Sequence, residues 1–297
     1  MKSQTKAELL LLSVTFIWGS TFVITKSLIE EASPFIYTGI RFSLAAALLF
    51  LVYPKRLRTF SKPALKRGAV LGSLVFAGFV LQTIGLQFTT ASKSAFFTGM
   101  LVVLTPIIHY VVQHFYKLMR KPLRAGNIVG VVFAALGLYF LTSPEGSSFN
   151  IGDAMTLVCA LLFAIYIVYL DFATDVEDKM QLTLVQFLVC GIAGMIGAFS
   201  VETIHLHWTN GFIASLLYLT IFATVIAMAV QIRFQGDTTP TRAALIFALE
   251  PVIAGVMAFY VRGEILGTLG VIGGGIIMCG VLISEFSEQL PLLTREF

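Results

Sequence analysis

The sequence predicts an all-α integral membrane protein whose ten transmembrane helices form two inverted five-helix repeats. Its composition predicts the membrane location: 57% of the 297 residues are hydrophobic, 12% are charged, and the mean hydropathy is +0.90. Soluble domains carry about 25% charged residues, so this chain has too little polar surface to remain in water. Ten long apolar runs and an internal repeat predict the rest of the architecture.

Each of the ten apolar runs is long enough to cross the membrane as a helix. A helix needs about 20 mostly apolar residues to span the hydrocarbon core. The runs do not alternate between apolar and polar residues, which favours helices over a β-barrel. Their approximate bounds are 8–28, 35–53, 68–88, 95–115, 125–142, 152–171, 181–200, 211–233, 241–260 and 265–284. The short segments between them leave no room for a soluble domain.

The positions of lysine and arginine predict how the chain is oriented in the plasma (inner) membrane. If the N-terminus is cytoplasmic, 16 of the 20 basic residues lie in inside segments, and three (Lys26, Lys93 and Arg262) lie outside. The remaining one, Arg41, lies within the second span. Cytoplasmic segments are enriched in basic residues, so we expect both termini to be cytoplasmic. The net charge of +4 then reflects membrane topology and implies no nucleic-acid partner.

An internal repeat relates the two halves of the chain. Residues 104–108 (LTPII) recur 145 positions later as residues 249–253 (LEPVI). We therefore divide the chain into a first repeat, residues 1–145, and a second repeat, residues 146–297. Since each repeat holds five spans, an odd number, the second copy must enter the membrane from the opposite side.

Inverted repeats are widespread among secondary transporters, which bind their solute near the midplane between the repeats. The two halves can exchange conformations and so open the cavity to one side and then to the other. The sequence has no Walker motif for ATP hydrolysis and no G-x-S-x-G or H-E-x-x-H motif of an enzyme. These features favour gradient-driven transport of a small-molecule substrate over catalysis. A passive channel and a multidrug or organic-cation exporter are the alternatives.

Several short motifs, taken in their order and spacing, resemble the EamA family of the drug/metabolite transporter (DMT) superfamily. They are Trp18-Gly19, residues 91–95 (ASKSA) leading to 104–106 (LTP), residues 249–251 (LEP), and Gly263-Glu264. The resemblance covers the whole chain as two EamA-like halves. It implies a central cavity lined by helices 1–4 and 6–9, and amino acids, other metabolites or toxic organic cations as solutes. The first half departs from the pattern at Met119, which stands where Glu264 would have its partner.

Two ionisable residues, Arg41 and Glu250, lie deep within predicted spans. A charge at the bilayer centre costs about 2.5–3.5 kcal/mol on insertion scales, so such residues usually face a cavity or a partner. Glu250 could couple protons or capture a cationic group, or it could bond the backbone carbonyl that Pro251 leaves without a donor. Arg41 could anchor a substrate carboxylate, or it could form a salt bridge, with Glu250 as one partner. The sequence leaves these alternatives open.

Other polar and aromatic residues within the spans are further candidates for the cavity wall. They are Trp18, Thr21, Gln82, Tyr166 and Gln186. As a set they predict a substrate-binding cavity with aromatic walls and few charges, although each residue alone is more often a packing residue. Such a cavity suits amino acids or other amphipathic and aromatic solutes better than phosphates. His109 is a candidate proton relay, because imidazole titrates near physiological pH, or a hydrogen-bonded packing residue.

Prolines and glycines within the spans predict hinges and close helix contacts. Pro106 and Pro251 match in the repeat, and each removes a backbone hydrogen bond, so both are candidate hinge points. Gly126 and Gly130 are four residues apart, as are Gly270 and Gly274, a spacing that favours tight helix packing. These contacts could lie inside the chain or form the seam of a homodimer.

No cofactor or metal ion is expected. The three cysteines form no C-x-x-C pair, and His205 and His207 lie in a loop without a third ligand nearby. The glycines near residue 270 are followed by no Gly-Lys-Ser/Thr, so they do not predict a phosphate-binding loop. The predicted partners are the lipid bilayer, a small solute and, at the glycine faces, a second copy of the chain.

Overall fold

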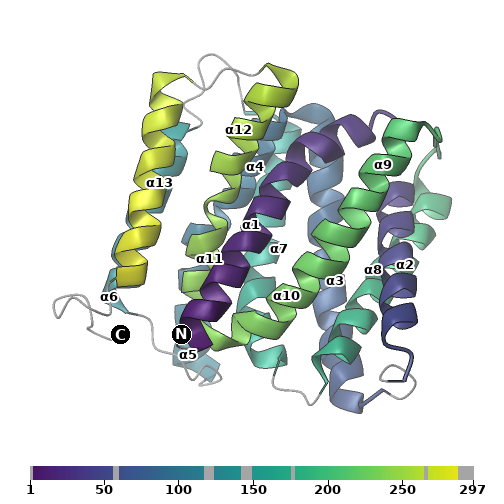
Figure 1. The fold of residues 1–297 in the computed structure, drawn as a ribbon, viewed down its shortest axis with the longest axis horizontal. Coiled ribbons are helices and arrows are strands. Elements are labelled where there is room, and N and C mark those ends of the chain that lie inside the picture. The colour runs from purple at the N-terminus through teal and green to yellow at the C-terminus, as the bar shows by residue number, and fades with distance from the viewer. Residues whose placement is uncertain are drawn as a thin grey trace.

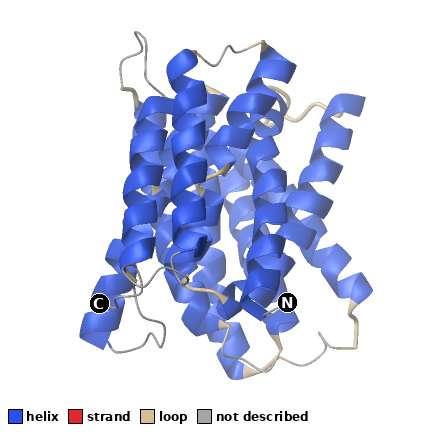
Figure 2. Cartoon of the chain, turned by 60° about the vertical axis from the view of Figure 1, so that its left-hand side comes forward, coloured by secondary structure: helices blue, strands red, loops and turns tan. Residues whose placement is uncertain are grey.

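The computed structural model describes residues 3–55, 60–116, 124–141, 149–174, 178–263 and 267–286. In these ranges the regular structure is helical, apart from isolated β-bridge residues such as the pair Ala32 and Leu206 (Figures 1 and 2). Eight helical stretches are long and apolar enough to cross a membrane, and two shorter apolar helices complete ten spans within the described residues. The predicted all-helical, ten-span architecture is confirmed.

The helices follow the predicted runs closely. The first repeat contains α1 (Ser3–Leu28), α2 (Pro34–Val52), α3 (Lys62–Phe88), α4 (Ala91–Gly99), α5 (Leu101–Tyr116) and α6 (Ala125–Leu141). The second contains α7 (Ile151–Ala173), α8 (Lys179–Val201), α9 (Asn210–Tyr218), η1 (Leu219–Ile226), α10 (Ala227–Phe234), η2 (Gln235–Asp237), α11 (Pro240–Phe247), α12 (Glu250–Arg262) and α13 (Thr268–Phe286). The fourth span of each repeat is therefore split into two helices, α4–α5 and α11–α12.

Charged side chains at the helix ends join elements that are distant in the sequence. The carboxylate of Glu202, which follows α8, accepts hydrogen bonds from the backbone N–H groups of Phe35 and Ile36 at 3.1 and 2.8 Å. A negative group at this position stabilises the positive end of the α2 dipole. At the end of α1, Lys26 Nζ donates to the carbonyl oxygens of Leu86 and Thr89 at the end of α3.

The first helices of the two repeats, α1 and α7, begin at opposite ends of the bundle (Figure 1). Lys26, near the end of α1, contacts Thr89, whose hydroxyl donates to Asp153 in the first turn of α7 at 2.6 Å. Glu8, near the start of α1, lies instead beside Arg242 at the other end of the bundle. This antiparallel start is the geometry expected when a five-helix unit is inserted twice.

The breaks in the two split helices do not coincide with the matched prolines. The breaks lie at Met100 and near Leu249, which are 149 residues apart, whereas Pro106 and Pro251 are 145 residues apart. Pro251 lies in the first turn of α12, where its missing N–H group removes no helical bond. Pro106 lies inside α5. The two predicted hinge residues therefore occupy different positions relative to the breaks in their spans. The offset between the breaks exceeds the offset between the prolines by four residues, about one helical turn.

The eighth span is not a continuous α-helix. Its middle section, Leu219–Ile226, is a π-helix, in which the Thr224 hydroxyl donates to the carbonyl oxygen of Leu219 five residues back at 2.9 Å. The hydrophobic run at 211–233 gave no sign of this irregularity. Short π-helical segments frequently mark functional sites. The segment contacts α1 and α2, so these helices are candidates to carry residues of a functional site.

Glycines bring α6 and α13 together backbone to backbone. A Cβ atom added to Gly130 would lie 2.7 Å from the carbonyl oxygen of Gly280, and one added to Gly137 would lie 2.6 Å from that of Gly273. These distances leave no room for a side chain. One of the glycine faces predicted to form either an internal contact or a homodimer seam, that of Gly130, is thus occupied inside the chain.

This packing makes a pair of glycine substitutions informative about the α6–α13 contact. We expect Gly137→Ala to destabilise the protein by about 1–3 kcal/mol, because the added methyl group overpacks a backbone contact. Gly275→Ala is the matched control, since nothing lies within 4 Å of its added Cβ. Thermal unfolding in detergent should show a lower midpoint for Gly137→Ala and an unchanged or higher one for Gly275→Ala. Equal midpoints would contradict the close contact.

Candidate functional site

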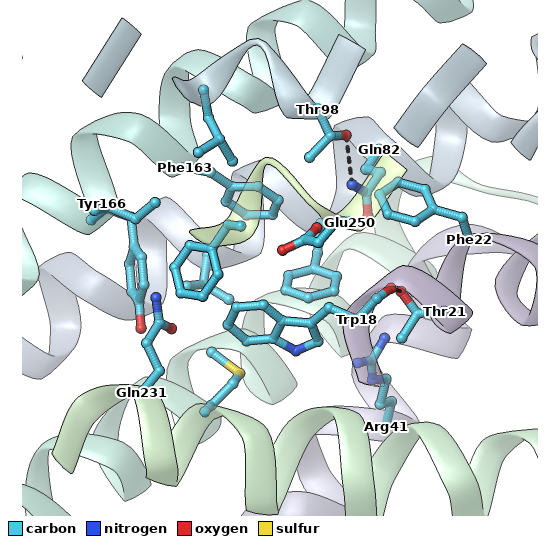
Figure 3. Close-up of a pocket in the computed structure, with 16 residues that line it drawn as sticks. Trp18, Thr21, Phe22, Arg41, Gln82, Thr98, Phe163, Tyr166, Gln231 and Glu250 are labelled. Carbon is cyan, nitrogen blue, oxygen red and sulfur yellow. Dashed lines mark hydrogen bonds between the residues drawn. The ribbon is translucent and has the colours of Figure 1, made fainter. Parts of the chain in front are cut away.

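A cavity of about 70 Å³ lies in the middle of the bundle, between the two repeats. Helices from both repeats contribute to its wall, namely α1 to α5, α7 and α10 to α12. The lining residues are Trp18, Thr21, Phe22, Arg41, Val75, Phe79, Gln82, Thr98, Leu101, Phe163, Tyr166, Ile167, Met228, Gln231, Phe247 and Glu250 (Figure 3). The wall is mostly aromatic and aliphatic, with a few polar side chains that project into it.

The structure brings six of the seven predicted binding residues to this cavity. They are Trp18, Thr21, Arg41, Gln82, Tyr166 and Glu250. The seventh, Gln186 on α8, is fully buried behind the wall, where its Oε1 accepts a hydrogen bond from the Tyr166 hydroxyl at 3.3 Å. Its Nε2 lies 3.9 Å from the Met228 sulfur. Gln186 thus contacts two lining residues, and α8 contributes no residue to the wall.

Arg41 is a buried cation held by neutral groups. Its side chain on α2 is 1% exposed, and its Nε donates to the Thr224 hydroxyl at 2.7 Å and its Nη1 to the Tyr37 hydroxyl at 2.8 Å. The guanidinium carbon lies 5.9, 5.6 and 5.0 Å from the ring centres of Tyr37, Phe42 and Phe79. Aromatic faces attract a cation but do not neutralise it. Its remaining nitrogen, Nη2, has no hydrogen-bond partner among the residues that the structure describes.

The π-helical segment provides two of the contacts that fix this side of the cavity. The Trp18 indole N–H on α1 donates to the carbonyl oxygen of Ala223 at 2.9 Å, and the adjacent Thr224 hydroxyl accepts the bond from Arg41. The indole also packs on Phe247, with ring centres 5.3 Å apart. The irregular segment therefore positions both the large aromatic wall and the buried cation.

Glu250, the first residue of α12, is 8% exposed and lines the same cavity as Arg41. Among the described residues, none donates a hydrogen bond to its carboxyl group, and no ion pair joins it to Arg41. In the view of Figure 3 the Trp18 indole lies between the two side chains. The structure contains neither an Arg41–Glu250 salt bridge nor a hydrogen bond from Glu250 to a backbone carbonyl before Pro251, so both alternatives expected from the sequence are absent among the described residues.

Two neutral polar residues of the wall were not anticipated from the sequence. Thr98 on α4 accepts a hydrogen bond from Gln82 Nε2 at 3.0 Å, drawn as the dashed line in Figure 3. Gln231 on α10 donates to Gln235 Oε1 at 2.8 Å. A glutamine within an apolar run could have identified Gln231. Thr98 carried no signal, because threonine hydroxyls commonly bond their own helix backbone.

The other predicted functional residues lie away from the cavity wall. His109 on α5 is fully buried, with its Nδ1 3.2 Å from the Thr241 hydroxyl on α11. Pro106 and Pro251 do not line the cavity. Glu264, which carried part of the family resemblance, lies outside the described residues. His109 therefore joins the split helices of the two repeats and does not contact the space where a solute would bind.

Within the described part of the chain, the cavity combines an incompletely bonded cation, Arg41, with a carboxyl group, Glu250, that has no ion-pair partner, inside mostly apolar walls. Burying a charge away from water is costly unless a partner compensates it. A small solute that carries a carboxylate and an ammonium group would provide both partners at once. In the part of the chain that the structure describes, no group of three or more His, Cys, Asp or Glu residues is arranged to hold a metal ion.

Comparison with known proteins agrees with this architecture. The EamA-like transporter family matches the chain twice, over residues 5–143 and 150–286. This chain belongs to the EamA-like transporter family. It is therefore a multi-pass membrane protein built from two copies of the family's unit, as the helix count and the antiparallel start of α1 and α7 indicate.

Relatives of this EamA-like protein extend over most of its length. A protein of Archaeoglobus fulgidus named "Uncharacterized transporter" is 34% identical over 278 residues, covering 93% of this chain and 85% of the relative. The "Uncharacterized inner membrane transporter YedA" of Escherichia coli K12 is 25% identical over 284 residues, covering 94% and 90%. One crystal structure has a TM-score of 0.78 at 16% identity and covers 97% of this chain and 99% of that one. That likeness shows a shared fold.

The bond between Trp18 and the π-helix can be tested with the two tryptophans of the chain. We expect Trp18→Phe to lower stability by about 1–3 kcal/mol, because the buried hydrogen bond from the indole N–H to the carbonyl of Ala223 is lost. Trp208→Phe is the matched control, since Trp208 is 60% exposed and packs edge-on against Phe212. Thermal unfolding in detergent would compare the two. A Trp18→Phe protein as stable as the control would contradict the contact.

Proposed function

We propose that this EamA-like protein is a secondary transporter that exports small organic metabolites by alternating access, driven by the proton gradient. The proposed solutes are amino acids and similar amphipathic or aromatic molecules with a carboxylate and an amine. One observation carries the proposal: Arg41 and Glu250 line the same central cavity, and no ion pair joins them. The membership in a transporter family supports it.

Arg41 is the proposed contact for the solute carboxylate. Its Nη2 keeps its hydrogen-bonding capacity, while the other bonds of the guanidinium hold the group in place. A hydrogen bond from a guanidinium to a carboxylate is charge-assisted and about twice as strong as a neutral one. Because the group is already oriented and largely desolvated, little reorganisation accompanies binding. The aromatic rings around it favour a solute with an apolar side chain.

Glu250 is the proposed contact for the solute amine and for the coupling proton. The same carboxyl group can accept a proton or pair with an ammonium group, and each occupant excludes the other. Proton entry and solute exit then compete for one residue, so an inward proton gradient drives solute outward. The mixed charge of the cavity favours zwitterions over organic cations, because Arg41 would repel a solute that carries positive charge alone.

The size of the cavity supports a solute-free, closed conformation. A volume of about 70 Å³ holds only a few water molecules. An amino acid with a large side chain requires the wall to move outward. Alternating access supplies such movement, because the two repeats shift relative to each other around the central site.

The proposed setting is the inner membrane, with both termini in the cytoplasm. The distribution of 16 basic residues inside and three outside supports this orientation. The name of the relative YedA, an inner membrane transporter, supports the location. In this orientation the end of the bundle that holds Glu8 and Arg242 faces the cytoplasm.

Proton coupling is tested by substituting Glu250 in a transport assay. Purified protein in liposomes is given a panel of labelled amino acids with and without a pH gradient. We expect the gradient to accelerate uptake against the proton flow, and Glu250→Gln to abolish this acceleration, because an amide cannot exchange a proton. Saturable but gradient-independent transport by the unaltered protein would contradict the coupling. Flux that never saturates would support a channel, and transport of organic cations alone would support a multidrug exporter.

The carboxylate contact is tested by binding measured at Trp18. Trp208→Phe leaves Trp18 as the single indole, beside the cavity, so its fluorescence reports occupancy. We expect Arg41→Gln to weaken binding of an amino acid at least about tenfold, because a bond to a charged group is lost. Binding of the methyl ester of the same amino acid should change little. Equal losses for acid and ester would contradict the assigned contact and point to a general disturbance of the cavity.

A further inference from the structure

Two largely buried ion pairs lie near the starts of α1 and α7. These two helices begin at opposite ends of the bundle (Figure 1). At one end, Glu8 Oε1 on α1 lies 2.8 Å from Arg242 Nε on α11, with the two side chains 7% and 6% exposed. At the other, Asp153 Oδ2 on α7 lies 2.9 Å from Lys93 Nζ on α4, with exposures of 0% and 19%. Each pair joins the first helix of one repeat to the fourth span of the other.

The same sequence motif builds both ends. Residues 89–93 (TTASK) and 238–242 (TTPTR) share two threonines followed, three residues after the second, by a basic residue, and they are 149 positions apart. In each motif the second threonine caps a helix by accepting the backbone N–H of the basic residue, at 3.1 Å from Lys93 and 3.2 Å from Arg242. Capping fixes the first turn of α4 and of α11, and with it the position of the cation.

The first threonine of each motif also donates to the carboxylate. The Thr89 hydroxyl donates to Asp153 Oδ1 at 2.6 Å, and the Thr238 hydroxyl donates to Glu8 Oε1 at 2.8 Å. Glu8 and Asp153 are 145 residues apart. We name the two sets the Glu8 cluster (Glu8, Thr238, Arg242) and the Asp153 cluster (Asp153, Thr89, Lys93). Their bonding is equivalent under the internal repeat, although their sequences are not identical.

We propose that the two clusters are the gates of the transporter, and that each opens while the other stays closed. This proposal rests on the proposed function, because a gate controls the access of a transported solute to its binding site. In this structure both clusters are bonded, which corresponds to an occluded state. Separation of α1 from α11 would open the cavity at the Glu8 end, and separation of α7 from α4 would open it at the Asp153 end.

The helices that carry the motifs lead directly from the clusters to the cavity. Thr98 lines the cavity from α4, one turn beyond Ser94, and Phe247 lines it from α11, one turn beyond Ala243. Residues four apart lie on the same helix face. Ser94 and Ala243 are 149 residues apart and are both fully buried, one residue after the cation of each cluster. They therefore mark equivalent points on the two paths.

Ion pairs suit this task because their strength depends on their surroundings. In a closed, dry interface the attraction between opposite charges is strong, and separating the charges there is costly. Once the interface opens and water enters, both charges are solvated and the separated state is stabilised. Such a contact therefore favours fully closed or fully open arrangements over intermediate ones. This property is what a transporter needs if it is never to open both ends at once.

Cysteine accessibility tests the gates without any knowledge of the solute. Ser94→Cys and Ala243→Cys serve as matched reporters, each in a background where Cys159, Cys190 and Cys279 are replaced by alanine. The probe is a charged, membrane-impermeant maleimide applied to the protein in detergent. We expect Glu8→Gln to increase labelling at position 243 several-fold without increasing it at position 94. Asp153→Asn should produce the reverse pattern.

Two outcomes would overturn the proposal. Labelling that changes at neither reporter would make the clusters static packing contacts, and equal increases at both reporters in each variant would indicate general loosening. Because a single substitution removes the carboxylate that faces one cation, the neutral pairs Glu8→Gln with Arg242→Gln and Asp153→Asn with Lys93→Gln are measured alongside. These double variants should show the same reciprocal labelling at positions 94 and 243. If a single variant does not fold, the labelling of the double variant tests the proposal in its place.

The readout keeps this proposal separate from the proposed function. Reciprocal accessibility in a protein that transports none of the solutes would preserve two coupled gates and contradict the assigned transport activity. Transport that continues normally while the accessibility pattern is absent would preserve the function and remove the gates. Exchanging the charges in the Glu8 cluster, with Glu8→Arg and Arg242→Glu together, should return labelling at position 243 toward its original level.

Discussion

The bilayer provides no hydrogen-bonding partner for a buried polar group, and this constraint organises the whole protein. At the two ends of the bundle, the buried carboxylates of Glu8 and Asp153 each have a cation and a threonine hydroxyl as partners. At the centre, Arg41 and Glu250 line one cavity without pairing with each other. The structure thus concentrates its unsatisfied charge where a solute from either side could compensate it.

The internal repeat is preserved at the ends and departs from symmetry at the centre. The position 145 residues after Arg41 is Gln186, behind the cavity wall, and the position 145 residues before Glu250 is Thr105, whose hydroxyl bonds the Leu101 carbonyl. Alternating access needs two equivalent ends, because each must open and close. The proposed zwitterionic solute needs only one cation and one carboxylate. The two parts of the molecule therefore meet different requirements, and the charged residues proposed to bind the solute lie where the repeats differ.

The sequence predicted the ten spans and the two central charges because both leave strong signals. Long apolar runs are easily recognised, and Arg41 and Glu250 stand out because charge at membrane depth is costly. The π-helix at Leu219–Ile226 left no such signal, since its residues are apolar apart from two threonines, and the contacts from Trp18 and Arg41 come from distant parts of the chain. Thr98 and Gln231 were missed because neutral polar residues also occur as packing residues. Glu8 and Asp153 lie at the ends of spans, where an acidic residue normally meets water.

An experimental structure of the protein in lipid nanodiscs with a bound amino acid tests the central claim most directly. The account predicts solute density in the central cavity, with the carboxylate against Arg41 Nη2, the ammonium group beside Glu250, and at least one of the two end clusters bonded. A cavity in which Arg41 and Glu250 pair with each other while the solute binds elsewhere would contradict it.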